Sequence, residues 1–318
     1  MGSLEGIVES LDPYLEPARL CQAFFILAAC AVLAVAITPP SARGLLTQYG
    51  ARSSTPPDGT NAQNTASEGR FTRLIGWATS FGQIPHSWFG HFYVLSVLSS
   101  AFWAVQYFYH GAFLDAIAKH QTARAPTPSM TVQQVQLAWL LMALQGVRRL
   151  YESLFVMRAS SSKMWIVHWL LGCAYYLCIG IAVWIEGSNA ILQFDRQLSQ
   201  LRWPSTRETG GLSLFLLAWS MQYRCHSYLA GLKKYSLPEV GMFRHLICPH
   251  YTCECLLYLS LAIVAAPEKQ VCNRTVLCGL IFVTVNLGVT ASGTRRWYAG
   301  KFGEEKIKGK WNMIPFIY

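Results

Sequence analysis

The sequence predicts an all-α protein, a multi-pass bundle of about seven transmembrane helices. Of its 318 residues, 53% are hydrophobic and only 13% are charged, whereas soluble domains carry about 25% charged residues. The apolar residues are gathered in several runs, most of them close to the roughly 20 residues with which a helix crosses a bilayer. Composition and run length therefore indicate an integral membrane protein.

The first 130 residues or so are expected to hold two spans. The first, residues 18–37, contains almost no polar side chain. Residues 38–70 are rich in Pro, Ser, Thr, Gly and Asn and predict a flexible loop, followed by a short interfacial segment at 72–83. The second span is expected at 91–110, and residues 111–131 are predicted to form a loop.

The third predicted helix begins near Thr131, a residue type suited to an N-cap, and leaves its apolar core near Arg148. The remaining spans are expected at residues 164–185, 210–230, 252–266 and 276–292. Between the fifth and sixth spans lies Gln222–Glu254, which we expect to be a loop at the membrane surface.

Basic residues predict the orientation. They follow the third, fifth and seventh spans, so about seven spans place all three groups on one face, which should be cytosolic. The N-terminus would then be lumenal and the C-terminus cytosolic. The excess of Lys and Arg in the cytosolic loops of membrane proteins explains the net charge of +10 better than binding to nucleic acid does. No nucleic-acid partner is therefore expected. The main residues of the three basic groups are, in chain order, Arg148, Arg149, Arg158 and Lys163, then Lys233, Lys234 and Arg244, then Arg295 and Arg296.

Gln222–Glu254 is unusually rich in hydrogen-bonding side chains, and polar groups at membrane depth are expensive and usually functional. Lys and Arg bind phosphates, and Tyr and Arg offer flat faces for a purine. No GxGxxG follows a predicted strand, so side chains would have to hold a dinucleotide. The alternative is that these charges only set the membrane orientation.

Several motifs occur in a specific order. They are PHSWFGHFY at Pro85–Tyr93, RRLYESLFV at Arg148–Val156, Gln222 and His226 followed by LKK, Tyr235 and Pro238, then CPHY with Glu254, and finally Arg296-Trp-Tyr298 with the ending IPFIY. Together they resemble the steroid 5α-reductase family, and most closely its polyprenol reductase branch. The resemblance covers roughly the last three quarters of the chain.

The resemblance implies an oxidoreductase of the endoplasmic reticulum membrane. It would use NADPH to saturate the α-isoprene unit of a long-chain polyprenoid, in dolichol biosynthesis for protein N-glycosylation, with polyprenoid and membrane lipids as its partners. Residues 91–318 would form the catalytic domain with C-terminal NADPH-binding loops, and residues 1–90 a span and a cytosolic loop. A 3-oxo-steroid 5α-reductase or an enoyl reductase on the same fold is the alternative. A transporter or receptor is more distant, because no internal repeat is visible.

The resemblance also implies a cofactor site. Gln222 and His226 stand where the family holds the nicotinamide end with Asn and Asp, and His250 replaces an Asn four residues before a matching Glu254. On a helix, this i, i+4 spacing puts His250 and Glu254 on one face. The other expected cofactor-binding residues are Arg149, Arg158, Lys233, Tyr235, Arg296 and Tyr298.

No metal is expected, although Cys248, His250, Cys253 and Cys255 superficially look like zinc ligands. Their spacing fits no standard zinc pattern, and Cys253 and Cys255 would point apart on a helix.

The proton-donating Tyr of the family is missing, since the matching position, near Gly146, is not aromatic. The candidates for this role are His91, Tyr93, Gln145 and Tyr151. The aromatic residues around His91 could equally form an interfacial belt. Because an allylic alcohol offers no oxygen on which charge can develop during hydride addition, we hypothesise that the reactive substrate is the aldehyde, polyprenal.

Overall fold

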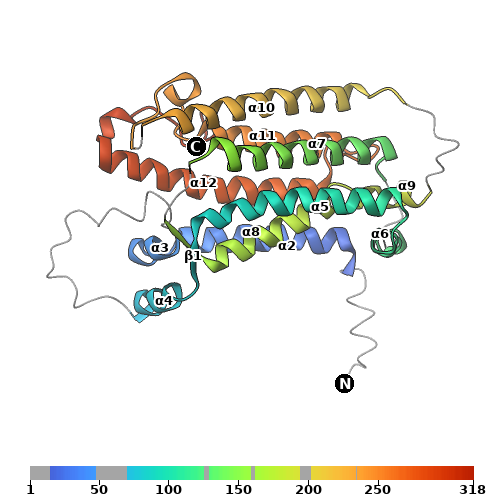
Figure 1. The fold of residues 1–318 in the computed structure, drawn as a ribbon, viewed down its shortest axis with the longest axis horizontal. Coiled ribbons are helices and arrows are strands. Elements are labelled where there is room, and N and C mark those ends of the chain that lie inside the picture. The colour runs from blue at the N-terminus through green and yellow to red at the C-terminus, as the bar shows by residue number, and fades with distance from the viewer. Residues whose placement is uncertain (1–14, 48–69, 125–128, 159–161, 194–201, 234) are drawn as a thin grey trace.

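The fold is a bundle of long helices, seen here in a computed structural model that describes residues 15–47, 70–124, 129–158, 162–193, 202–233 and 235–318. Figure 1 shows the long helices stacked in layers. Within the described ranges, seven helices have 16 residues or more. They are α2 (Pro17–Ala36), α5 (Gly90–Phe108), α7 (Val132–Tyr151), α8 (Ile166–Ala182), α10 (Thr206–Gly231), α11 (Pro249–Val264) and α12 (Arg274–Phe302).

Three of these helices begin at a side-chain cap. The hydroxyl of Thr131 accepts a hydrogen bond from the backbone of Gln134, whose side chain bonds back to Thr131, so the predicted N-cap is confirmed as a capping box. Ser205 forms the same motif at the start of α10. Asn273 caps α12 by accepting a hydrogen bond from the backbone N–H of Val276 at 2.9 Å.

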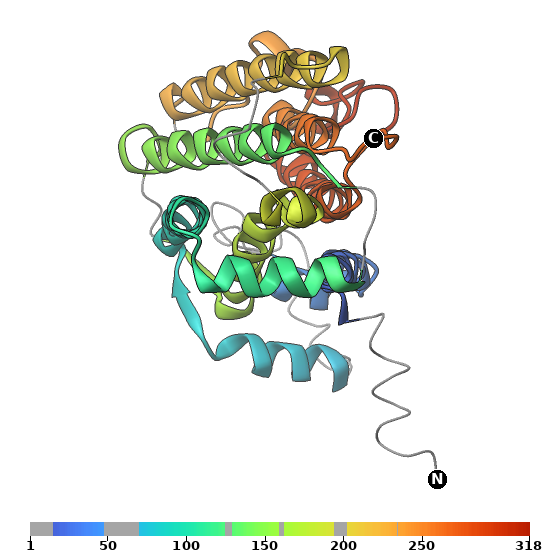
Figure 2. The same ribbon diagram turned by 90° about the vertical axis from the view of Figure 1, so that its right-hand side faces the viewer.

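The helices pack around one apolar core. α10 packs against α11, α12 against α2 and α11, and α5 against α7 and α8, and Figure 2 shows the layers from the side. Phe25 of α2 lies 5.8 Å from the ring of Tyr175, which lies 5.2 Å from the ring of Phe282 on α12. α2 is therefore part of the same core as α12.

Four helical segments in the described part of the chain are long and apolar enough to cross a membrane: Pro17–Ala36, His86–Phe108, Ile166–Leu192 and Arg274–Phe302. Together with the helical fold, they confirm an all-α membrane protein. α11 has only 16 residues, and α7 and α10 carry several polar side chains. The number of crossings and the orientation of the termini therefore remain predictions.

Two predicted loops contain helices. α6 (Ala112–Arg124) lies within residues 111–131, and α3 (Pro40–Thr47) within 38–70. These predictions were wrong because a search for long apolar runs misses helices as short as these, which contain few consecutive apolar residues. The interfacial segment corresponds to α4 (Arg70–Ser80), and residues 48–69 lie outside the described ranges.

Gln222–Glu254 is not a single loop. α10 continues to Gly231, α11 begins at Pro249, and the connection contains a short 3₁₀ turn, η7 (Gly241–Arg244). The prediction was wrong at both ends of the stretch, where Gln222, on α10, bonds to His250 and Glu254, on α11, instead of facing solvent. The exposed residues Lys233 and Arg244 do lie in the connection between the two helices. The C-terminal segment braces this connection, since Ile247 donates a backbone hydrogen bond to Trp311 at 2.9 Å.

A two-stranded antiparallel sheet, which the sequence did not predict, joins β1 (Gln83–Pro85) to β2 (Lys163–Trp165). β1 precedes α5 and β2 precedes α8, so the sheet holds the starts of these two helices together. Strands this short carry too few residues for an alternating pattern to show.

Candidate active site

Polar side chains converge at one end of the bundle, where α5 and α11 begin and α7 and α10 end. α7 packs there against α5, α10 and α11. α7 is continued by a π-helical turn, η5 (Glu152–Val156), in which the backbone N–H of Met157 bonds to the carbonyl of Glu152 at 2.7 Å. Such turns are rare and often occur at functional sites.

Glu152 is the buried anion of this region, with no exposed surface. Its carboxylate forms ion pairs with Arg149 and with Nε of Arg148 at 3.5 Å, and is hydrogen-bonded to Nδ1 of His226 at 2.7 Å. A charge this deep is tolerated because it is paired and hydrogen-bonded. We call these four residues the Glu152 cluster.

The ionisation of Glu152 is coupled to folding. Burial raises the pKa of the carboxyl, but the hydrogen bond with His226 and the charges of Arg149 and Arg148 outweigh it, so the pKa lies below its usual range. The charged carboxylate therefore stabilises the fold above the ordinary glutamate pKa. That stabilisation is lost as the pH falls through the lowered value.

A second set of hydrogen bonds centres on Gln222, which is 1% exposed. Its Oε1 accepts hydrogen bonds from Gln145 at 3.0 Å and from Arg148. Its Nε2 donates to Glu254 and to the backbone carbonyl of His250 at 3.3 Å. One amide thus links α7, α10 and α11.

Tyr93 of α5 joins the Glu152 cluster through Arg149. The guanidinium lies 4.7 Å from the centre of the Tyr93 ring and donates a hydrogen bond from Nη2 to the phenol oxygen. The oxygen of Tyr93 therefore acts as an acceptor toward Arg149, which leaves its own O–H proton available to another acceptor. Tyr93 is 4% exposed.

The structure brings together Gln222, His226, His250, Glu254 and Arg149 of the expected cofactor residues, and Tyr93 and Gln145 of the expected proton donors. His226 and His250 face each other across α10 and α11, with ring centres 5.6 Å apart. His250 Nδ1 is buried and has no hydrogen-bond partner among the described residues. An additional polar group at this place would satisfy it.

His91, Tyr151 and Arg158 lie outside this convergence. His91 is exposed and packs beside Trp88 at 5.3 Å, Tyr151 is exposed beside Phe155, and Arg158 is exposed. Helix geometry explains the first two, because residues two apart point about 200° apart. With Tyr93 and Arg149 facing inward, His91 and Tyr151 must face outward.

The other expected cofactor residues gather near the end of α12. Lys301 Nζ lies 4.2 Å from the ring centre of Tyr235, which has a positive φ of 67°, and the Tyr235 ring lies 6.2 Å from that of Trp297. Tyr298 packs on Trp297 at 5.4 Å. Lys233 and Arg296 are exposed nearby in the chain, and Lys234 lies outside the described residues.

Sequence reasoning missed Glu152 as the anion of the site and Arg148 as its partner. Glu152 follows two arginines at i+3 and i+4, a spacing typical of helical ion pairs, and this signal was available. For the zinc alternative, the described part of the chain contains no group of three or more His, Cys, Asp or Glu side chains placed to hold a metal ion.

Comparison with known proteins gives two results. A family model described as 3-oxo-5-alpha-steroid 4-dehydrogenase matches residues 162–318. Among curated proteins, "Polyprenal reductase 2" of Oryza sativa subsp. japonica is 26% identical over 370 residues, covering 96% of this chain and 98% of the relative. "Polyprenal reductase" of Xenopus tropicalis is 34% identical over 196 residues, covering 58% and 61%. The protein of the same name from Saccharomyces cerevisiae is 28% identical over 235 residues, covering 74% and 75%.

Proposed function

The chain belongs to the steroid 5α-reductase family, on its polyprenol reductase branch, and from this premise we propose that it reduces the α-isoprene double bond of polyprenal. This reaction would serve dolichol synthesis for protein N-glycosylation. The names of the similar proteins from rice, frog and yeast support the substrate class. The structural observation that supports it most is Tyr93, a buried phenol held by Arg149 at the convergence of four helices.

The aldehyde is favoured over the alcohol for a chemical reason. When a nucleophile adds to the β-carbon of a conjugated aldehyde, negative charge develops on the carbonyl oxygen, and a donor placed there lowers the barrier. An allylic alcohol has no such oxygen. A rigid donor in a water-poor pocket thus matches polyprenal.

We assign the role of donor to Tyr93. Arg149 donates to the phenol oxygen, so the phenol proton can be donated to the carbonyl oxygen of the substrate as hydride adds to the β-carbon. The α-carbon of the resulting enol then takes a proton from water, and the oxygen returns its proton to Tyr93, which gives the saturated aldehyde. The position that matches the proton-donating Tyr of the family lies near Gly146, where α7 is too close to α5 for a side chain. A Cβ atom at Gly146 would lie 2.7 Å from Ser96 Oγ. Tyr93 approaches from the facing helix, α5, and so replaces the missing side chain.

For the other polar and basic side chains of the site we propose NADPH as the cofactor, which supplies the hydride when bound. His250 Nδ1 lacks a partner among the described side chains, as a polar ligand site would require. We propose that Gln222, His226, His250 and Glu254 hold the nicotinamide end. The phosphates and adenosine would lie over the cationic and aromatic side chains near the end of α12: Lys233, Tyr235, Arg296 and Tyr298.

We further propose seven crossings of the endoplasmic reticulum membrane, with a lumenal N-terminus and a cytosolic C-terminus. In this arrangement the Glu152 cluster and the basic end of α12 share the cytosolic face, which carries the NADPH pool. The proposed function is tested by reducing a long-chain polyprenal with the purified protein and NADPH. An enzyme that reduced only 3-oxo-steroids would be a steroid reductase instead.

A further inference from the structure

An apolar cavity of about 240 Å³ lies between α5 and α7, away from the Glu152 cluster. Its lining is aromatic and aliphatic, and includes Trp103, Tyr107, Trp139, Leu140, Trp184 and Ile191. The amide of Gln136, at the wall, donates a hydrogen bond to the Tyr107 hydroxyl at 3.0 Å, so it is already satisfied. The cavity therefore suits an apolar occupant.

The size of the cavity is sufficient for part of a hydrocarbon chain. An apolar cavity of about 150 Å³ stays dry and binds benzene in another protein, and this one is larger. Protein interiors are otherwise closely packed, so filling such a space recovers contacts that its lining side chains lack.

The cavity lies at a defined distance from the site. From Tyr93 to Trp103 on α5, and from Arg149 to Trp139 on α7, the chain advances ten residues, or about 15 Å of helix. Both helices thus give the same separation. An isoprene unit adds about four C–C bonds, roughly 5 Å, so an isoprenoid whose headgroup lies at Tyr93 would bring roughly its third or fourth unit to the cavity.

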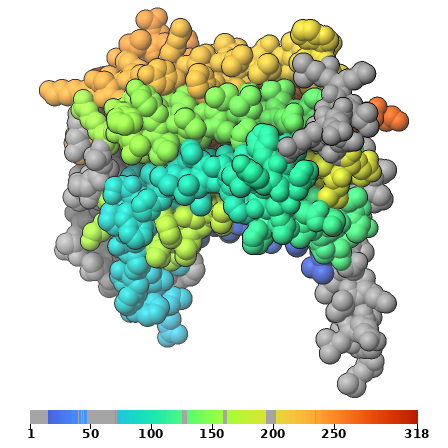
Figure 3. Space-filling view, turned by 45° about the vertical axis from the view of Figure 1, so that its right-hand side comes forward, coloured from blue at the N-terminus to red at the C-terminus, as the bar shows by residue number. Residues whose placement is uncertain are grey.

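The chain would reach the cavity along the outer seam of α5 and α7. Inside, the helices touch closely, since Gly146 abuts Ser96 and the indole N–H of Trp139 donates to the Ser100 carbonyl at 3.0 Å. Outside, both helices expose apolar side chains, including Leu98 at 60% and Val147 at 54%. Figure 3 shows the two helices as adjacent bands on one face of the molecule.

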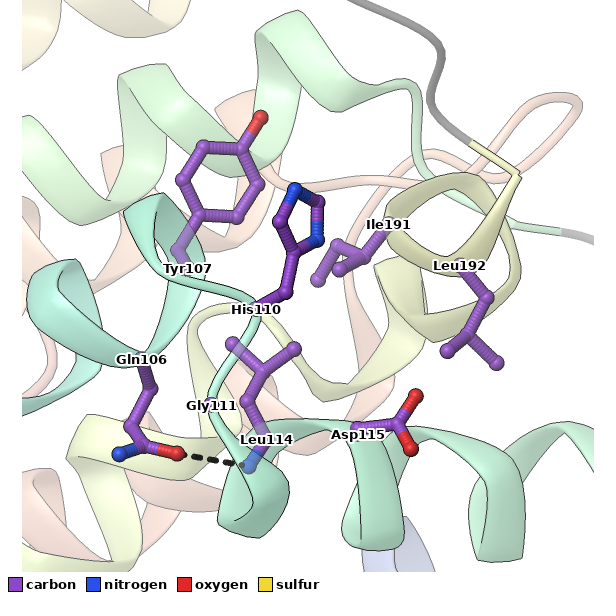
Figure 4. A pocket seen from close by; sticks show the side chains of 8 residues that line it. All are labelled: Gln106, Tyr107, His110, Gly111, Leu114, Asp115, Ile191 and Leu192. Carbon is purple, nitrogen blue, oxygen red and sulfur yellow. Dashed lines mark hydrogen bonds between the residues drawn. The ribbon is translucent and has the colours of Figure 1, made fainter.

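The far end of the cavity is polar. A smaller pocket of about 90 Å³ shares Tyr107, Leu114 and Ile191 with the cavity and adds polar groups such as His110 and Asp115. Figure 4 shows its side chains, with Gln106 accepting a hydrogen bond from the backbone of Leu114 at 3.4 Å. A hydrocarbon would avoid this end and pass from the cavity into the surrounding lipid.

We propose that this cavity is a binding site for the isoprenoid tail of the substrate, which it grips roughly three to four units from the headgroup. The proposal rests on the proposed function and adds a dependence on chain length to it. A short isoprenoid aldehyde, whose chain ends before the cavity, gains nothing from the site. A longer one gains affinity until its chain fills the cavity, and further units lie in lipid.

The test fills the cavity and compares two substrates. Ala104 lines it, whereas Ala101 of the same helix is exposed and does not. A104L should raise KM for the long aldehyde at least about tenfold, as the loss of a hydrocarbon subsite predicts, and leave kcat/KM for the short aldehyde unchanged. A101L should change neither. Equal loss on both aldehydes, or no loss with A104L, would overturn the proposal.

A second measurement does not depend on A104L folding. A long isoprenoid aldehyde with a photoreactive group on its fourth unit should cross-link the wild-type protein to peptides of α5, α7 or the Trp184 region. Cross-links confined to other helices would overturn the proposal. If wild-type protein reduced neither aldehyde, the proposed function itself would fail, and cross-linking would still report on the cavity.

Discussion

The guanidinium of Arg149 lies 4.7 Å from the ring centre of Tyr93 and donates a hydrogen bond to its hydroxyl oxygen. The same guanidinium is paired with the buried carboxylate of Glu152. Tyr93 is therefore oriented by a residue that is itself held in place by an ion pair. The consequences of this arrangement can be measured.

Removing the phenol hydroxyl tests the assignment of Tyr93. Y93F should lower kcat for polyprenal roughly 10²- to 10⁴-fold, the usual effect of losing a proton-donating group, with a much smaller change in KM. Y151F removes the same atom from an exposed ring on α7 and serves as the matched control. If Y93F kept full kcat, or if Y151F lost as much, the donor would have to be another residue.

Glu152 should matter for stability as well as activity. Removing one partner of a buried ion pair leaves uncompensated charge and costs about 3–5 kcal/mol. E152A should therefore lower the thermal midpoint of the purified protein in detergent by several degrees or prevent its accumulation. R158A, which alters an exposed arginine in the same region, should leave the midpoint unchanged. An unchanged midpoint for E152A would mean that the cluster is not important for stability.

His250 and Glu254 are expected to bind the cofactor. H250A and E254A should each accumulate in membranes but raise KM for NADPH or abolish reduction, since losing a charge-assisted hydrogen bond costs about 1.5–3 kcal/mol. E268A alters an exposed glutamate beyond the other end of α11 and should behave as wild type. Wild-type kinetics for both H250A and E254A would return these residues to a purely structural role.

The basic side chains near the end of α12 predict the choice of cofactor. Lys233 and Arg296 are exposed there, and Lys301 lies over Tyr235. This is more positive charge than a pyrophosphate requires, which favours a 2′-phosphate. NADPH should give a much higher kcat/KM than NADH, and R296A should reduce the difference. Equal rates with both cofactors in the wild-type protein would refute this.

The sequence predicted the seven long helices, but it could not predict how they pair. The spans are so apolar that periodicity does not show which face contacts which neighbour. Gln222 and Glu254 were selected by their motifs, yet their link through one amide depends on the contact between α10 and α11. α6 and the β1–β2 pair were missed because they are short and carry no long apolar run.

The candidate proton donors show the same limit. His91 and Tyr93 belong to one motif, and the sequence alone gave no reason to choose between them. On a helix they point about 200° apart, so only one of them faces Arg149. The choice required the position of α7 relative to α5. Glu152 and Arg149, by contrast, are three residues apart, and their pairing was readable from spacing alone.

The most direct test of the account is the oxidation state of the substrate. Purified wild-type protein with NADPH should convert polyprenal to dolichal rapidly and leave polyprenol almost unchanged, because only the aldehyde develops charge on the oxygen that faces Tyr93. The measurement is the rate of NADPH consumption with each substrate, with the products separated by chromatography. Comparable rates on polyprenol, in the absence of any dehydrogenase that forms the aldehyde, would contradict the account.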